Sequence, residues 1–70
     1  MSTWYILPNG NVKHPSGLEL QPEQDWFPTQ ESMEAMFAAQ RALGAPDELI
    51  VKRIMDMAAD AERWLRDNVG

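Results

Sequence analysis

The spacing of hydrophobic residues changes near Pro28, from short alternating runs before it to helical spacing after it. Residues 3–7 are mostly apolar or aromatic β-formers, and the turn-forming residues 8–11 follow them. Further along, the pattern gives a return strand over 12–14, a second turn over 15–17 and a short third strand over 18–20. Residues 1–20 therefore predict an antiparallel β-hairpin or a three-stranded meander. Residues 21–28 are predicted to be a loop, because they contain two prolines among polar residues.

Two helices are predicted after this loop. Thr29 is a suitable N-cap for a first helix over residues 29–43, and Gly44 provides its stop. Pro46 stands at the first position of a second helix, over residues 46–68. The apolar side chains of this second helix fall within an arc of about 120°, and they are Ile50, Ile54, Met57, Ala58, Ala61, Trp64 and Leu65.

The pattern as a whole predicts one α+β domain spanning the 70-residue chain, with the β-hairpin packed on a C-terminal two-helix antiparallel hairpin. At 1.5 Å per residue, the second helix is about 14 Å longer than the first. The overhang carries Ala61, Trp64 and Leu65, which need a cover. Either the β-hairpin supplies this cover, through Trp4 and Ile6, or a second copy of the chain does.

Self-association is thus one of the alternatives that the sequence leaves open. Val51, Met55 and Val69 lie beside the main apolar stripe of the second helix and widen it. A homodimer would use these side chains together with the overhang, and the residues predicted for this contact are Val51, Met55, Trp64, Leu65 and Val69.

Composition narrows the chemistry available to the chain. It has no cysteine, and His14 is its single imidazole, so neither a Cys–His nor a Ser–His–Asp arrangement can be assembled and a structural zinc is not expected. No glycine-rich loop with a following lysine cradles a phosphate. Asp56 and Asp60 share one face of the second helix and are interpreted as part of a solvated charged surface. We therefore expect a noncatalytic protein without a cofactor or a metal.

Hydropathy and charge bear on where the protein acts. No apolar run reaches the roughly 18 residues that span a bilayer, and the first residues lack a signal-peptide pattern. Together with the absence of cysteine, these features predict a cytoplasmic protein with no membrane contact. With a pI near 4.5, nonspecific attraction to nucleic acid or to an anionic membrane is not expected.

The net charge of −5 arises in one central segment, because no Lys or Arg lies between Lys13 and Arg41. Glu31 has a second explanation there, since a carboxylate is favoured in the first turn of a helix. For Trp26 and Phe27 the alternatives are to cap the core or to stay exposed as anchors. The residues predicted to bind a partner are Glu19, Glu23, Asp25, Trp26, Phe27, Glu31 and Glu34.

A patch of one charge sign beside aromatic residues is suited to docking on a basic surface of a partner protein. The predicted function is accordingly that of a small protein-binding module. By analogy of size and charge alone, it would act like the small acidic inhibitors of phages and mobile elements, such as anti-CRISPR proteins. One alternative is a DNA-binding regulator, because residues 39–50 resemble a helix-turn-helix, although the second helix opens with Asp47 and Glu48. A structural, self-associating domain is the other alternative.

Overall fold

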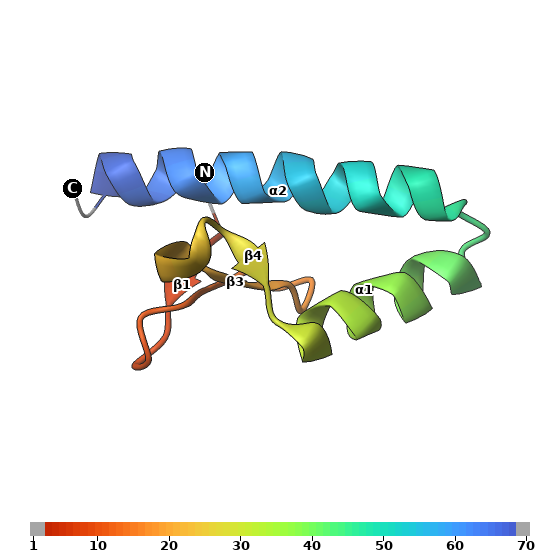
Figure 1. The fold of residues 1–70 in the computed structure, drawn as a ribbon, viewed down its shortest axis with the longest axis horizontal. Helices are drawn as coiled ribbons and strands as arrows, with labels where there is room; N and C mark the ends of the chain where they lie inside the picture. Colours follow the sequence, from red (N-terminus) through yellow and green to blue (C-terminus); the bar gives the residue numbers. More distant parts are fainter. Residues whose placement is uncertain (1–2, 69–70) are drawn as a thin grey trace.

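The computed structural model describes residues 3–68 and confirms the predicted α+β fold, with an N-terminal sheet and two C-terminal helices (Figure 1). In chain order the elements are β1 (Tyr5–Ile6), β2 (Val12–Lys13), β3 (Glu19–Gln21), the 3₁₀ helix η1 (Pro22–Gln24), β4 (Phe27–Pro28), α1 (Gln30–Ala42) and α2 (Asp47–Asn68). The long helix α2 runs the length of the molecule, with the sheet under one half and α1 under the other. Neither α1 nor α2 is long and apolar enough to cross a membrane.

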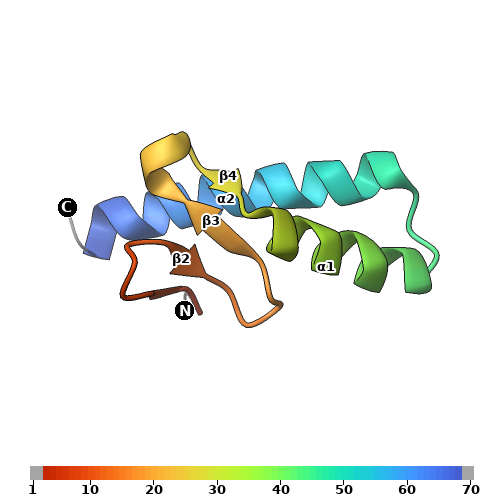
Figure 2. The same cartoon turned by 60° about the horizontal axis from the view of Figure 1, so that its bottom comes forward.

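The four strands form an antiparallel meander in the order β1-β2-β3-β4 (Figure 2). The first three strands match the predicted meander. The fourth was not predicted: the segment expected to be a loop contains η1 and β4, where Pro28 pairs with Leu20 of β3. Proline is tolerated there because β4 is an edge strand, where a missing N–H interrupts no interior ladder.

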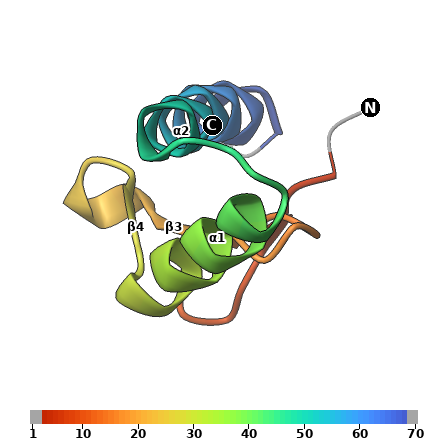
Figure 3. The same cartoon turned by 90° about the vertical axis from the view of Figure 1, so that its right-hand side faces the viewer.

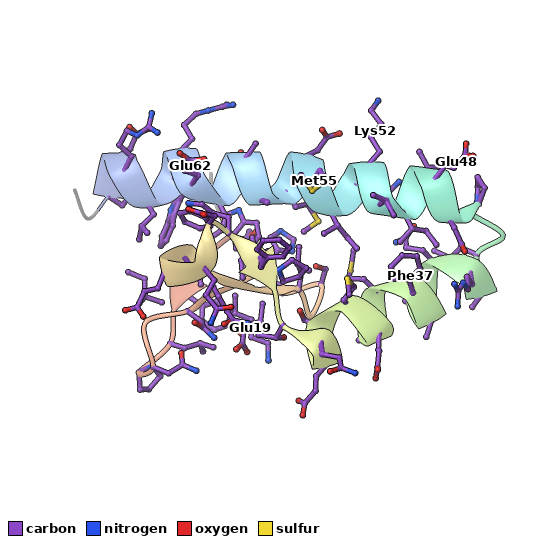
Figure 4. The ribbon with its side chains drawn as sticks, in the orientation of Figure 1. Glu19, Phe37, Glu48, Lys52, Met55 and Glu62 are labelled. Atoms are coloured by element: carbon purple, nitrogen blue, oxygen red, sulfur yellow. The ribbon has the colours of Figure 1, made fainter. Side chains whose placement is uncertain are left out.

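The register of the meander separates two faces of the sheet. Val12 pairs with Leu20, and both are buried on the face that packs under α2. Lys13 pairs with Glu19 in the next row, and side chains of successive rows point to opposite faces. Glu19 accordingly lies on the face turned away from α2 (Figure 4).

The helix boundaries follow from local signals that the sequence already contains. The Thr29 hydroxyl accepts a hydrogen bond of 3.2 Å from the Ser32 amide, which caps the first turn of α1. Gly44 adopts φ +85°, and its amide bonds to the Arg41 carbonyl, which closes the other end. Pro46 then accepts hydrogen bonds from the amides of Leu49 and Ile50 as α2 begins.

Figure 3 shows α2 lying over the sheet and α1. The hydrophobic core lies between these elements. Its members come from the strand segments, α1 and α2, and they are Trp4, Val12, Leu18, Leu20, Met36, Ile50, Ile54, Ala58 and Ala61. The members from α2 all belong to the predicted apolar arc, so the prediction of its buried face is confirmed for these positions.

The overhang of α2 is covered within the chain. Trp4 is buried there, and Trp64 and Leu65 pack against the same core. The prediction that Ile6 also covers the overhang was wrong, because its side chain is 48% exposed at the edge strand β1. Trp26 also packs partly buried against the core, from the loop before β4.

Candidate functional site

The fold divides the acidic segment into two groups. Glu19, Glu31 and Glu34 line one open groove of about 680 Å³ between the sheet and the start of α1. We call this the acidic groove and define it by Lys13, Glu19, Gln30, Glu31, Ser32 and Glu34. Glu23 and Asp25 lie outside this lining, on η1 and on the turn that follows it. The structure thus brings together three of the five predicted carboxylates.

The walls of the acidic groove are joined by the carbonyl group of Glu19. This oxygen accepts a hydrogen bond of 3.0 Å from the Thr29 amide, and the Ser32 hydroxyl lies 3.0 Å from it. Ser32 is only 5% exposed, so its hydroxyl fixes the first turn of α1 against β3 from a buried position. The carboxylates of Glu31 and Glu34 therefore stand on a helix end whose position relative to Glu19 is fixed.

The groove carries an excess of negative charge. Glu19 accepts a hydrogen bond of 2.7 Å from the Asn11 amide group, and Glu34 accepts one of 3.3 Å from Gln30. These donors are neutral, and Lys13 is the single cation of the lining. Within residues 3–68, the ion pairs are Arg41–Asp47 and Glu62–Arg66, both outside the groove. The groove thus has negative charge available to a cationic group of a partner.

Trp26 and Phe27 differ in their environment. Trp26 packs against the core, whereas Phe27 on β4 is 65% exposed. Asp25 and Trp26 both have left-handed backbone conformations, with φ of 57° and 65°. This kink, held by a 3.0 Å bond from the Trp26 amide to the Gln21 carbonyl, precedes the exposed ring. One aromatic side chain is therefore structural and the other is free to anchor a partner.

The residues predicted for self-association do not share one environment. Val51 and Met55 are exposed on α2. Trp64 and Leu65 are half-buried against the core of the same chain. Val69 lies outside the described residues. The homodimer stays a prediction, for which the structure leaves Val51 and Met55 as the accessible members.

Asp60 and His14, two other side chains considered for chemistry, make contacts within the fold. Asp60 accepts a hydrogen bond of 2.9 Å from the Trp4 indole, so this carboxylate stabilises the fold. The His14 ring lies 4.9 Å from the same indole at an interplanar angle of 60°, and its Nδ1 accepts a hydrogen bond of 3.1 Å from the Ser16 amide. In the part of the chain that the structure describes, no group of three or more His, Asp or Glu side chains is arranged to hold a metal ion.

The segment that resembles a helix-turn-helix is closed by an ion pair. Arg41 at the end of α1 donates to Asp47 at the start of α2 through two bonds of 3.0 and 3.1 Å. These hydrogen bonds lower the pKa of Asp47 and raise that of Arg41. A nucleic-acid phosphate would meet the carboxylates of Asp47 and Glu48 at this helix start, which is unfavourable.

The sequence reasoning missed Lys13, Gln30 and Ser32 as members of the site. The position of Lys13 could have been found, because a hairpin centred on Ser16 places it opposite Glu19. Ser32 carried no comparable signal, since its contact with β3 depends on how α1 packs.

Comparison with known proteins gives no match to a protein-family model, to a characterised protein or to a solved structure.

Proposed function

We propose that this protein is a small noncatalytic protein-binding module whose acidic groove docks on a basic surface of a partner protein. The observation that carries the proposal is the convergence of Glu19, Glu31 and Glu34 on one groove, where Lys13 is the only cation among the described residues of the lining. An excess of one charge sign in a concave surface raises the association rate with an oppositely charged partner.

Phe27 supplies the apolar component of this proposal. Its ring is 65% exposed on β4, the strand that leads directly into α1 and the groove. An exposed aromatic ring anchors an interface when it enters a pocket of the partner and is desolvated there. The charge of the groove would then raise the association rate, and Phe27 would lengthen the lifetime of the complex.

The proposal extends to an inhibitory role. A basic protein surface often serves to bind nucleic-acid phosphates, and an acidic module that covers it competes with the nucleic acid. This is the mode of action expected from the analogy with the small acidic inhibitors of phages and mobile elements, including anti-CRISPR proteins.

Affinity capture from a lysate of the source organism tests the proposal. The bait is compared with a Glu31→Lys/Glu34→Lys variant, and retained proteins are identified by mass spectrometry. The matched control, Asp56→Lys/Asp67→Lys, makes the same change in net charge at exposed positions of α2. We expect the wild type and the control to retain the same basic protein and the groove variant to lose it. Equal retention by all three baits would contradict the proposal.

A further inference from the structure

Apolar side chains are exposed on both helices of the pair, on a surface that meets the acidic groove at Glu34. Met55 is 63% exposed and Val51 48% exposed on α2, and Met33 is 39% exposed on α1. Phe37, partly buried, lines a shallow depression on α1 together with Met33. We call this surface the Met55 face and define it by Met33, Phe37, Val51 and Met55.

An ion pair links Phe37 of α1 to the first turn of α2. The Arg41 guanidinium lies over the Phe37 ring at 5.0 Å and pairs at 3.0 Å with Asp47. Val51 follows Asp47 by four residues and Met55 follows Val51 by four, so each is a surface neighbour of the one before it on α2. In Figure 4, Phe37 projects from α1 toward α2, and Met55 lies on the near side of α2.

The charges around the Met55 face are arranged along α2. Glu48 precedes Met55 by one heptad and Glu62 follows it by one heptad, so both carboxylates lie on the stripe that contains Met55. Each lies about 10 Å from Met55 along the helix axis. Lys52 points away from α1 in Figure 4. On the α1 side, the depression that contains Met33 and Phe37 is also lined by one anion, Glu34, and by one cation, Arg41, which is paired with Asp47.

The Met55 face could bind either a second copy of this chain or a helix of a partner protein, and the charge pattern favours the partner. If α2 of a second copy packed antiparallel about Met55, Glu48 of each chain would face Glu62 of the other. If it packed in parallel, each carboxylate would face its own counterpart. Like charges directly opposite one another disfavour an interface. One oxygen of Glu62 already pairs with Arg66, whereas Glu48 has no ion pair among the described residues. A basic helix satisfies both positions.

We propose that the Met55 face binds one helix of a partner protein, with apolar residues at its centre and a Lys or Arg about one heptad to either side. The proposal shares the premise of the proposed function that the partner is basic, but it concerns a surface that has only Glu34 in common with the lining of the acidic groove. It specifies the secondary structure and the charge spacing that the partner presents to the helix pair.

A designed peptide tests this inference. The probe is a fluorescein-labelled Ala/Leu helix of about 20 residues, with central leucines and one Lys a heptad before and after them. A second peptide carries Glu in place of both Lys residues. Binding to the full chain is followed by fluorescence anisotropy. We expect the Lys peptide to bind and the Glu peptide to bind at least about tenfold more weakly.

Variants of the protein then test whether the peptide binds at the Met55 face. Met55→Glu should lower the affinity for the Lys peptide at least about tenfold. The matched control Lys52→Gln makes the same change in net charge and should leave this affinity unchanged. The double variant Glu48→Lys/Glu62→Lys should prefer the Glu peptide. Circular dichroism measures the helicity of each variant and verifies that it is folded. The variants are expected to fold because the substituted side chains are exposed.

Three results would overturn the proposal. The first is that the folded wild type does not bind the Lys peptide, and the second is that Met55→Glu and the wild type bind it equally well. The third is sedimentation that shows a wild-type dimer which Met55→Glu converts to a monomer. The groove variant Glu31→Lys separates this proposal from the proposed function, because it should leave peptide affinity unchanged. Peptide binding with failure of the capture experiment would contradict the acidic-groove proposal alone.

Discussion

The indole N–H of Trp4 donates a hydrogen bond of 2.9 Å to the carboxylate of Asp60, joining residues 56 positions apart in the chain. The same indole lies 4.9 Å from the His14 ring, next to the β2–β3 turn. Trp4 thus connects the first strand, the second turn and α2. Because a 70-residue chain has a small core, one such connection has a large effect on stability.

Removing this hydrogen bond should destabilise the protein. Trp4→Phe keeps an aromatic ring but leaves Asp60 without its indole donor, and a hydrogen bond to a charged group contributes about 1.5–3 kcal/mol. We expect a loss of this size in the free energy of unfolding, measured by urea denaturation. Asp56→Ala, one turn earlier on α2, is the control and should change stability by less than about 0.5 kcal/mol. Equal effects of both substitutions would contradict this role of Trp4.

The left-handed backbone of Asp25 predicts a stabilising substitution. A left-handed backbone costs most non-glycine residues roughly 1–2 kcal/mol, and aspartate less, because its short polar side chain can hydrogen-bond locally. Glycine avoids this cost but loses about 0.5–1 kcal/mol more in backbone entropy on folding. Asp25→Gly should therefore raise the free energy of unfolding by no more than about 0.5 kcal/mol. Glu23→Gly should lower it, because Glu23 is in a 3₁₀ helix without a positive φ. A loss of stability in both variants would show that the turn carries no such strain.

The cap of α1 holds one wall of the acidic groove. Thr29→Ala removes the hydroxyl that accepts the Ser32 amide proton and should cost about 1 kcal/mol of stability. Thr29→Ser keeps the acceptor and should remain within about 0.5 kcal/mol of the wild type. Thermal denaturation followed by circular dichroism compares the three proteins. A Thr29→Ala variant as stable as the wild type would contradict the assignment of the cap.

The Arg41–Asp47 ion pair predicts a pH dependence of stability. The hydrogen bond from Arg41 lowers the pKa of Asp47 in the folded protein. The contribution of the pair is therefore complete above the ordinary aspartate pKa of about 3.9 and is lost as pH falls through the lower folded value. Asp47→Asn should be less stable than the wild type at neutral pH, and the difference should disappear in acid. Urea denaturation over this range measures it, and a difference independent of pH would contradict the pair.

The sequence predicted best the elements that are specified locally. Gly44 and Pro46 fixed the connection between the helices, and the apolar arc identified the buried face of α2. The strand β4 could not be predicted in this way, because it exists through the pairing of Pro28 with Leu20. Trp26 likewise packs against the core from a left-handed backbone kink that no local pattern signals.

The candidate site was predicted in composition but not in arrangement. The absence of Lys and Arg between Lys13 and Arg41 identified the carboxylates. Which of them share a groove is decided by the contact of Ser32 with the Glu19 carbonyl, a packing contact between α1 and β3. This contact joins Glu31 and Glu34 to Glu19 and leaves the other two carboxylates outside the groove.

The most direct test of the central claim is the dissociation constant of the captured partner, measured against salt concentration for the wild type and for Glu31→Lys/Glu34→Lys. If the acidic groove docks on a basic surface, wild-type affinity falls as salt rises, and the variant binds at least about tenfold more weakly at low salt. The control Asp56→Lys/Asp67→Lys should keep most of the affinity. Salt-independent binding of equal strength by the wild type and the groove variant would contradict the claim.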